Sequence, residues 1–333
     1  MSFHFSRREF IAGLGMTAAA TTISSVNAFA SPGPLRSQFK IGVINDEIGQ
    51  DFAHVCEVAA KEFGMQWMEL RGMWNKNIVN LDEKEVAEAR RILEKNKLQV
   101  TDIASPLFKT DWPGAPKSKY SPNADPSKRH DQFNADFTFE QQDEVLERSL
   151  AMAKTFNANR VRCFDFWRIE DQSPFRAAMD QKLTEAANKC GKKGVILMLE
   201  NEPACNTATG AESGRMLQAV KTPHFMLNWD PGNAATHGEV PYPDGYKLIP
   251  KDRIGHCHVK DAVKAGNGEY KWECMGRGII DWVGQFRALL NAGYKHAVSL
   301  ETHWHGAGTP EESSRQSWKG MKEDLEKAGA LKS

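Results

Sequence analysis

The sequence has 333 residues, and its 43 basic residues balance its 43 acidic residues, so the formal net charge at neutral pH is zero. Nucleic acid and anionic membranes are bound by basic surfaces, so this balance argues against both and favours a small, uncharged or weakly charged partner. The length exceeds that of a typical domain, but α/β barrels commonly reach about 250 residues or more as one unit.

The first predicted element is an export signal at the N-terminus. The segment SRREFI begins at Ser6 and carries Arg7 and Arg8, a short and weakly apolar stretch follows it, and the sequence AFA ends at Ala30. This order of features is typical of a bacterial signal peptide, and paired arginines are typical of the route that exports folded proteins. We therefore expect residues 1–30 to be a signal that the twin-arginine translocation machinery recognises and that is removed after Ala30. The alternative is a disordered basic tail.

The mature chain, residues 31–333, is expected to be a single catalytic domain in the periplasm or outside the cell. It contains no apolar run that approaches the roughly 20 residues needed to span a bilayer, so we predict no stable membrane insertion after removal of the signal. Its cysteines form no C-x-x-C pair, which argues against zinc-ribbon and thioredoxin-like folds. These cysteines are Cys56, Cys163, Cys190, Cys205, Cys257 and Cys274.

Short runs rich in β-branched or aromatic residues alternate with longer amphipathic stretches along the mature chain. A strand followed by a helix, repeated in this way, predicts a parallel (β/α)8 TIM barrel of the α/β class. A doubly wound open sheet is the alternative, but no G-x-G-x-x-G phosphate loop follows the first strand. The predicted strands span residues 39–44, 67–70, 100–103, 160–164, 195–199, 225–229, 254–259 and 297–300. The predicted helices span residues 53–63, 83–95, 139–155, 175–189, 212–220, 282–292 and 311–328.

The segment after the third predicted strand, residues 105–137, is rich in Pro, Lys, Asp, Asn and Ser and shows no periodicity. Loops of this length in a compact domain are usually functional or disordered. As the third βα loop it would lie at the C-terminal mouth of the barrel, where Lys109, Trp112 and His130 could cover a substrate. A solvated insertion is the alternative.

Each of the last four predicted strands finishes on a carboxylate or an imidazole. Adjacent strand ends meet at one mouth of a barrel, so ligands about 30 residues apart in the sequence can converge on one point. Three carboxylates and one imidazole favour Mn²⁺ or Mg²⁺, with Co²⁺ or Zn²⁺ as alternatives. We therefore predict one divalent metal ion, Mn²⁺ before the others, although each residue taken singly could be a loop ion pair or a helix cap. The segments LENEP, NWDPGN, GHCHVKD and SLETHW supply the predicted ligands Glu200, Asp230, His258 and Glu301.

Other polar residues near the strand ends are candidates for substrate contacts. Glu69 and Arg71 end the second predicted strand, and Lys260 follows the predicted ligand His258. His256 lies on the same strand, where we expect at most one of the two histidines to face the barrel axis at a given level. The complete set of weaker substrate-binding candidates is Glu69, Lys109, Trp112, Asn233, His256, Lys260 and His303.

The four strand-end segments, together with the strand–helix pattern over nearly the whole mature chain, resemble the xylose-isomerase-like TIM-barrel superfamily of sugar (phosphate) isomerases and epimerases. Its ketose 3-epimerases imply that the four predicted ligands bind the metal and that Glu200 and Glu301 also transfer protons. Two positions depart from those epimerases. Asn233 stands where they place a histidine, and Val263 with Lys264 stands where they carry an arginine. The sequence HVKD also resembles that of inosose dehydratases in the same superfamily.

The predicted site supplies a mechanism of proton transfer. A cation chelated by the carbonyl oxygen and adjacent hydroxyl of a sugar or keto-sugar would stabilise the enediolate that forms when the α-proton leaves. One of Glu200 and Glu301 would remove the proton, and the other would return one to the opposite face. If the intermediate carried a β-hydroxyl, the same site would eliminate water. We therefore predict a metal-dependent sugar isomerase or epimerase, with an inosose-dehydratase-like or keto-sugar lyase as the nearest alternative.

Two alternatives belong to other classes of function. An endonuclease-IV-like phosphodiesterase would share the barrel, but it needs further metal ligands and a basic face for DNA, and neither is evident in the sequence. A non-catalytic sugar-binding barrel would not need both Glu200 and Glu301. The sequence is compatible with a homo-oligomer but specifies neither the oligomeric state nor the sugar and its phosphorylation.

The export signal can be tested directly. We expect the native host to deliver a folded protein that has been cleaved near Ala30, because the basic pair and the AFA sequence stand at the spacing of a signal and its exit. N-terminal sequencing of the exported form would locate the cleavage site. An uncleaved chain retained in the cytoplasm would contradict the prediction.

Overall fold

The computed structural model describes most of residues 31–333 and none of the predicted signal. The described residues are 35–117, 119–121, 133 and 135–332. The predicted signal at residues 1–30 and the candidate His130 lie outside these residues, so both stay predictions. Within the described ranges, no helix is both long and apolar enough to cross a membrane.

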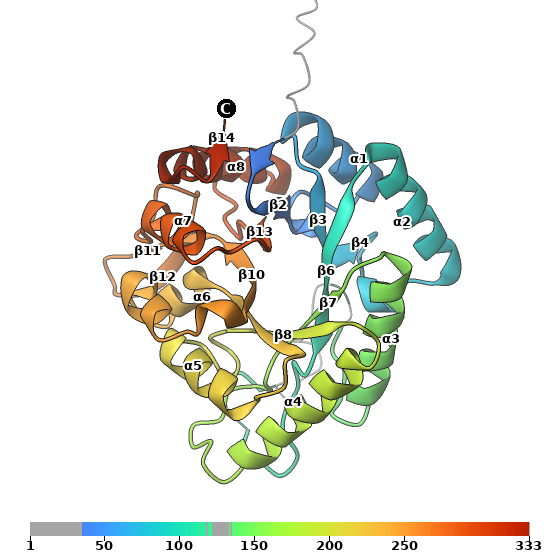
Figure 1. Cartoon of the computed structure of the whole chain (residues 1–333), viewed down its shortest axis with the longest axis vertical. Coiled ribbons are helices and arrows are strands. Elements are labelled where there is room, and N and C mark those ends of the chain that lie inside the picture. Colours follow the sequence, from blue (N-terminus) through green and yellow to red (C-terminus); the bar gives the residue numbers. More distant parts are fainter. Residues whose placement is uncertain (1–34, 118, 122–132, 134, 333) are drawn as a thin grey trace, which may run out of the picture. The chain divides into compact units, whose positions relative to one another are not determined.

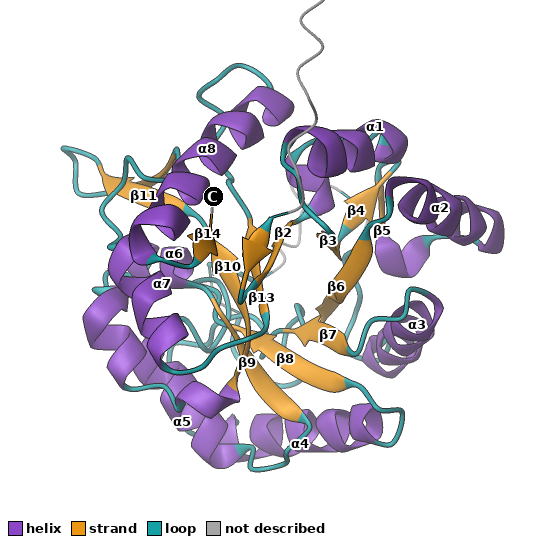
Figure 2. Ribbon diagram, turned by 45° about the horizontal axis from the view of Figure 1, so that its top comes forward, coloured by secondary structure: helices purple, strands orange, loops and turns teal. Residues whose placement is uncertain are grey.

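Eight parallel strands form a barrel at the centre of the structure (Figures 1 and 2). Their order is β2-β13-β10-β9-β8-β7-β6-β3, and a parallel bridge between Ile44 and Glu69 joins the two end strands, so the sheet nearly closes. The predicted (β/α)8 TIM barrel is confirmed, with all eight strands at the predicted places. The strands are β2 (Lys40–Val43), β3 (Trp67–Leu70), β6 (Gln99–Leu107), β7 (Arg160–Cys163), β8 (Ile196–Glu200), β9 (Phe225–Trp229), β10 (Ile254–Val259) and β13 (Ala297–Leu300).

Helices surround the barrel, and their apolar faces pack on it (Figure 2). Side-chain caps define where several of them begin: Asp82 and Thr209 each form a capping box with the glutamate three residues later. The predicted helix at 53–63 consists of α1 and a π-helical turn, Val58–Glu62. No helix was predicted after β9, where α6 is short and begins with proline at its first position. The helices are α1 (Phe52–Glu57), α2 (Glu83–Asn96), α3 (Gln142–Thr155), α4 (Arg176–Gly191), α5 (Gly210–Ala219), α6 (Pro231–Thr236), α7 (Trp282–Asn291) and α8 (Pro310–Ala328).

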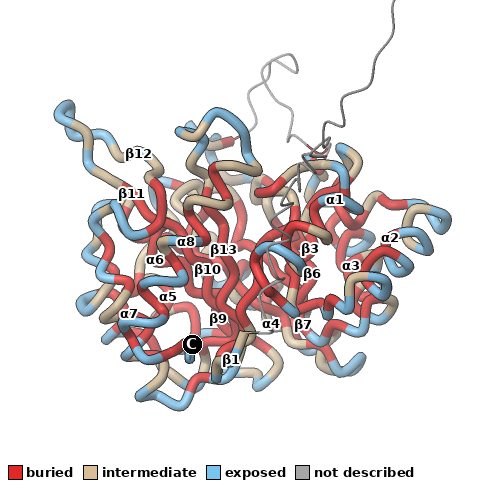
Figure 3. The backbone as a smooth tube through the Cα atoms, turned by 90° about the horizontal axis from the view of Figure 1, so that it is seen from above, coloured by how far each residue is buried: buried red, intermediate tan, exposed pale blue. Residues whose placement is uncertain are grey.

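The barrel strands are buried on both faces, as Figure 3 shows, because helices cover them outside and side chains fill the interior. Apolar residues such as Met68, Ile103 and Leu197 form the hydrophobic core. The interior also holds fully buried polar and charged side chains, which interiors accept only when they are paired. These residues include Glu69, Asp102, Asn228, Asp230, His256, His258 and Ser299. Polar side chains that contact one another therefore occupy the axis of the barrel.

A two-stranded hairpin follows β10 directly and extends away from the barrel strands (Figure 3). It consists of β11 (Asp261–Lys264) and β12 (Tyr270–Glu273). The ring of Trp272 lies 4.9 Å from the Lys260 ammonium and 5.5 Å from the ring of His303. The hairpin thus covers residues at the ends of β10 and β13. Two shorter pairs join β4 (Gly72–Met73) to β5 (Lys76–Asn77) and β1 (Arg36–Ser37) to β14 (Leu331–Lys332).

Asp261 fixes this hairpin to the turn that precedes α7. Its buried carboxylate accepts backbone N–H groups from Gly276 and Gly278 at Oδ2, at 3.2 and 2.9 Å. The other oxygen accepts those of Ala262 and Ile280, at 3.0 and 3.3 Å. One side chain therefore holds four backbone donors that have to be satisfied once the turn is folded.

We expect Asp261→Ala to lower the free energy of unfolding by about 2–4 kcal/mol, because several partly buried N–H groups lose a charged acceptor at once. Urea denaturation would measure it. Asp281→Ala is the matched control, since that aspartate accepts one N–H group, from Gly284, as the N-cap of α7, and should cost about 1 kcal/mol. Equal losses in the two variants would contradict this role of Asp261.

Candidate metal centre

The four predicted metal ligands lie together at the C-terminal ends of β8, β9, β10 and β13. One donor atom from each of Glu200, Asp230, His258 and Glu301 lies within 4.8 Å of the others. His258 Nδ1 is 3.3 Å from Glu200 Oε1, 3.5 Å from Asp230 Oδ2 and 3.1 Å from Glu301 Oε2. Asp230 and His258 are fully buried, and the two glutamates are 2% exposed. The barrel therefore brings residues from four strands to one point.

The local sequence around Asp230 holds its carboxylate in place. Asp230 is the N-cap of α6, and its Oδ1 accepts the backbone N–H of Asn233 at 2.8 Å. The backbone N–H of Asp230 donates to Asn201 Oδ1 at 2.8 Å, and the Asn201 amide donates back to the Asp230 carbonyl. The second oxygen, Oδ2, is thereby directed to the group of four.

Glu200 is surrounded by three partners that keep it ionised. Arg162 Nη1 lies 3.0 Å from Glu200 Oε2, and the Asn233 amide donates to Oε1 at 3.2 Å. Burial by itself would raise the pKa of Glu200, but His258 and Arg162 outweigh it and hold the pKa at about 2. Asn233, a predicted substrate contact, therefore supports Glu200.

Glu301 is held by three basic side chains. Lys260 Nζ lies 2.6 Å from Glu301 Oε2, Arg71 Nη1 lies 2.6 Å from Oε1, and His303 Nε2 lies 3.5 Å from the same oxygen. Burial opposes ionisation here too, but Lys260, His303 and His258 hold the pKa of Glu301 well below its usual value. Both glutamates are therefore carboxylates at neutral pH.

Lys260 is a predicted substrate contact that the fold places among the ligands. Its ammonium also lies 2.7 Å from Asp230 Oδ2, and the residue is 1% exposed. Burial would lower its pKa, but the carboxylates of Asp230 and Glu301 raise it. A Cβ on Gly232 would come within 2.5 Å of the Lys260 stem, so the first turn of α6 needs glycine there. Lys260 is thus a permanent charge in the site.

The charges and donor atoms of this cluster fit a divalent cation. Lys260 and Arg162 offset two of the three negative charges, and Arg71 is shared with two further carboxylates. Glu200 Oε2 and Asp230 Oδ2 are buried and accept no hydrogen bond of normal geometry. Negatively charged oxygen donors, beside an imidazole nitrogen that faces them, suit a hard or borderline metal ion.

A neighbouring group of donors, Glu47, Glu301 and His303, is already neutralised by Arg71. The Arg71 guanidinium lies 2.7 Å from Asp46 Oδ2 and 2.8 Å from Glu47 Oε1, besides its contact with Glu301. Burial would raise the pKa of Glu47, but His303 and Arg71 hold it at about 2. This group is therefore an ion-pair network at the rim of the site. The Arg71 guanidinium provides the positive charge that a second metal ion would otherwise provide there.

A cavity of about 350 Å³ opens onto Glu200 and Glu301. Lys109 lines it, 3.5 Å from Glu202 and 4.6 Å from the centre of the Phe164 ring. This volume is at the lower end of the range for small-molecule sites. The full lining is Arg71, Asn77, Pro106, Lys109, Phe133, Arg162, Phe164, Glu200, Glu202, Glu301 and His303.

Five of the seven weaker substrate candidates do not line this cavity, among them Asn233 and Lys260, which contact Glu200 and Glu301 instead. Glu69 and His256 are fully buried below the four ligands. Residues two apart on a strand point to the same side, so both β10 histidines face inward, one layer apart. Trp112 packs on Phe139 and Phe166 and lines a separate cavity, which shares Lys109 with the first. Of the weaker candidates, Lys109 and His303 do line it.

Several residues that hold the candidate ligands or their partners were not predicted from the sequence. Arg162 lies in the middle of β7, and a charged residue inside a buried strand was a usable signal. Asp46 and Glu47 follow the first strand, as the predicted ligands follow theirs. Asn201 is adjacent to Glu200 in the sequence, but nothing in the sequence indicated that it would hold Asp230.

Comparisons with known proteins agree with this architecture. The family model "Xylose isomerase-like TIM barrel" matches residues 58–324 of the chain. No curated protein matches the sequence. Solved structures match it at identities that establish the fold alone.

Three of these structures are representative. The probable 3-DHS dehydratase AsbF from Bacillus anthracis is 17% identical with a TM-score of 0.64, over 85% of this chain and 98% of that one. The IOLI protein with a binding zinc atom is 15% identical with a TM-score of 0.66, over 87% and 99%. D-psicose 3-epimerase in the presence of D-fructose is 15% identical with a TM-score of 0.62, over 87% and 100%.

The purified protein should contain about one divalent metal ion per chain, and Asp230→Ala or His258→Ala should abolish this stoichiometry, because loss of one ligand weakens such sites severely. Elemental analysis after gel filtration would measure the metal. His305→Ala, which removes an exposed histidine outside the cluster, should keep it. Undiminished metal in both ligand variants would place the site elsewhere.

Proposed function

Since the chain belongs to the xylose isomerase-like TIM barrel family, we propose that it is a sugar isomerase or epimerase that depends on one divalent metal ion. The observation that carries this proposal is the pair of carboxylates, Glu200 and Glu301, which line one cavity and share one group of metal ligands. D-psicose 3-epimerase and the IOLI protein, whose structure holds zinc, have the same fold and support the choice of substrate class and cofactor.

Glu200, Asp230, His258 and Glu301 would hold the ion. When bound, a divalent cation supplies a Lewis acid that polarises a carbonyl oxygen and acidifies the neighbouring C–H bond. The oxygen-rich ligand set favours Mn²⁺ or Mg²⁺, and Zn²⁺ remains compatible with the imidazole. This chemistry is needed here because both glutamates have low pKa values and are weak bases on their own.

Glu200 and Glu301 have the properties of a proton-transferring pair. Both lie beside His258 Nδ1, where Arg162 holds Glu200 and the pair Lys260 and Arg71 holds Glu301. Each is therefore fixed in orientation and ionised before a substrate enters, which removes the need to reorganise charge during the reaction. One carboxylate removes the proton next to the carbonyl, and the other delivers one to the carbon skeleton.

Polar side chains at the cavity wall would orient the sugar. Lys109 and His303 present donors to the cavity, and both already have a carboxylate partner, Glu202 and Glu47 respectively. Paired groups of this kind can exchange one hydrogen bond for a sugar hydroxyl without leaving a bare charge behind. The Phe164 ring on the same wall offers an apolar face for the C–H groups of a sugar.

Elimination of water is the second candidate reaction, and Lys260 is the observation that favours it. Its ammonium lies 2.6 Å from Glu301, which lines the cavity, so it adds positive charge beside the carboxylate that would pass the abstracted proton to the departing hydroxyl. Isomerisation has no leaving group to stabilise. Because the pKa of Lys260 is raised, the residue acts by hydrogen bonding and charge and retains its proton. The probable dehydratase AsbF shares the fold.

The proton-transfer proposal is tested by turnover in D₂O, after a panel of free sugars, keto-glycosides and inositols has identified a substrate. We expect deuterium at the carbon next to the carbonyl, because a proton held on a carboxylate exchanges with solvent before it is returned. Mass spectrometry and NMR of the product would measure the incorporation and would also show loss of water if the reaction is an elimination.

Glu301→Gln should slow turnover and solvent exchange by about 10²- to 10⁴-fold, since the amide keeps the shape and one oxygen donor but is not a base. The metal content and melting temperature are measured alongside to show that the site persists. Glu202→Gln, on the same cavity wall but outside the four ligands, should retain solvent exchange. Turnover of Glu301→Gln at the wild-type rate would exclude the two-carboxylate mechanism.

A further inference from the structure

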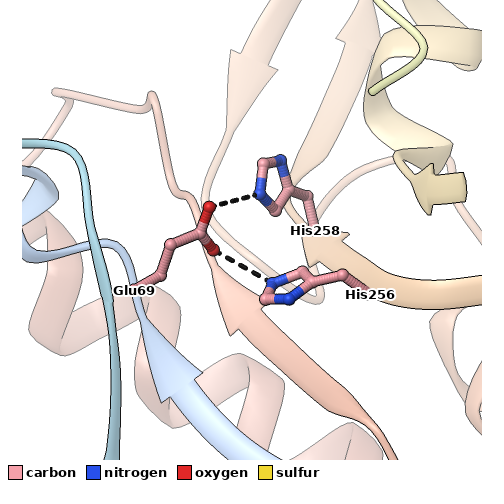
Figure 4. A group of neighbouring side chains, drawn as sticks. All are labelled: Glu69, His256 and His258. Carbon is pink, nitrogen blue, oxygen red and sulfur yellow. Dashed lines mark hydrogen bonds and ion pairs between the residues drawn. The ribbon is translucent and has the colours of Figure 1, made fainter. Parts of the chain in front are cut away.

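We infer that Glu69, which the sequence indicated only as a substrate contact, is the positioning residue that orients the metal ligand His258 and fixes where its proton lies. This inference rests on the proposed function, since it supposes a cation at the four ligands. It assigns a task to a carboxylate that no step of the proton transfer uses. Glu69 lies on β3, is fully buried and does not line the cavity, and Figure 4 shows its carboxylate directed at His258 and His256.

The two nitrogens of the His258 ring face different partners. Nδ1 faces the carboxylates of Glu200, Asp230 and Glu301, at 3.1–3.5 Å. Nε2, on the other edge of the ring, lies 3.0 Å from Glu69 Oε1. A carboxylate can only accept a hydrogen bond, so Nε2 carries a proton that it donates to Glu69. A cation among the other three carboxylates would then bind the ring through Nδ1, the nitrogen that faces them.

A second neighbour of Nε2 is consistent with this assignment. The amide nitrogen of Asn228 lies 3.0 Å from Nε2, while Asn228 Oδ1 is buried without a hydrogen-bond partner. Turning the amide by 180° leaves its shape almost unchanged and presents that oxygen to the Nε2–H group. Asn228 then joins Glu69 as an acceptor on this edge of the ring.

Glu69 is itself held by its neighbour His256, as Figure 4 shows. Its second oxygen, Oε2, lies 3.0 Å from His256 Nε2. The His256 ring in turn contacts Ser299 Oγ at 2.9 Å and Asp102 Oδ1 at 3.3 Å. Partners from β6, β10 and β13 therefore prevent the carboxylate from turning away, and the orientation of His258 is set before a metal ion arrives.

Glu69, His256 and His258 also have donor atoms close enough to suggest a second cation site. The contact between Glu69 and His258 is a hydrogen bond of normal length, and Glu69 Oε2 forms an ion-pair contact of 3.0 Å with His256. A cation there would take Nε2 of His258 while the first takes Nδ1, and the ring would have to lose both protons. The carboxylate is therefore a partner of the ligand and not a ligand.

The consequence is a contribution of Glu69 to metal affinity. A carboxylate that accepts the distal N–H of an imidazole makes the other nitrogen a stronger donor and restricts the ring to its binding orientation. Glu69→Gln retains an acceptor of the same shape and loses the charge, so the affinity for Mn²⁺ or Zn²⁺ should fall by about 10- to 100-fold.

The experiment titrates the metal-free full-length protein with Mn²⁺ and Zn²⁺ against a competing chelator at one fixed neutral pH. Ser299→Ala is the matched control, because it removes a contact of His256 at the same depth in the barrel and leaves the Glu69–His258 contact intact. Its affinity should stay within about threefold of wild type. The visible absorption of bound Co²⁺ should shift in Glu69→Gln and not in Ser299→Ala, because it reports the ligand field of His258 and not the stability of the fold.

Circular dichroism and urea unfolding of the metal-free proteins show whether each variant is folded. If Glu69→Gln does not fold, Glu69→Asp keeps the charge but withdraws it from His258 by one methylene group, and the same loss of affinity is expected. Wild-type affinity in the folded Glu69 variant, with metal lost in Asp230→Ala, would overturn the role of Glu69 and leave the proposed metal site standing. Wild-type affinity in Asp230→Ala would instead remove the proposed site, and the inference with it.

Discussion

The mutual repulsion of three buried carboxylates is the constraint on which the rest of the site depends. Glu200, Asp230 and Glu301 have oxygens within 4.8 Å of one another, in surroundings almost closed to water. Charges so placed are stable only with countercharges and hydrogen bonds. Arg162, Lys260 and the distributed charge of Arg71 supply most of this compensation, and the remainder fits a cation.

The side chains that compensate these buried charges are arranged in layers along the barrel axis. The top layer holds the four ligands, and the layer beneath it holds Glu69 and His256, with Asp102 and Ser299 as their outer partners. Each layer draws side chains from several strands, so no single element can shift without disturbing its neighbours. Rigid positioning of this kind is what proton transfer between fixed carboxylates requires.

The two glutamates have different neighbours. Glu200 contacts one cation, Arg162, and the neutral amide of Asn233, whereas Glu301 contacts the two cations Lys260 and Arg71. The two carboxylates therefore have unlike surroundings although they share one cavity. In the proposed reaction, this asymmetry would let one glutamate remove a proton and the other return it.

Local patterns in the sequence determined the eight strands, most of the helices and the four ligands, because periodicity and the polar residue that ends a buried strand are properties of adjacent residues. Parallel strands then bring such ends together whatever the loops do. The ligand partners depended on the tertiary structure. Arg71 meets Glu301 across 230 positions and His258 meets Glu69 across 189. Such contacts are set by strand register and by closure between β2 and β3. A shift of one residue in the register of a strand would turn each of its side chains to the other face. The sequence alone therefore predicted the four candidate ligands, and only the folded barrel decided which charges neutralise them.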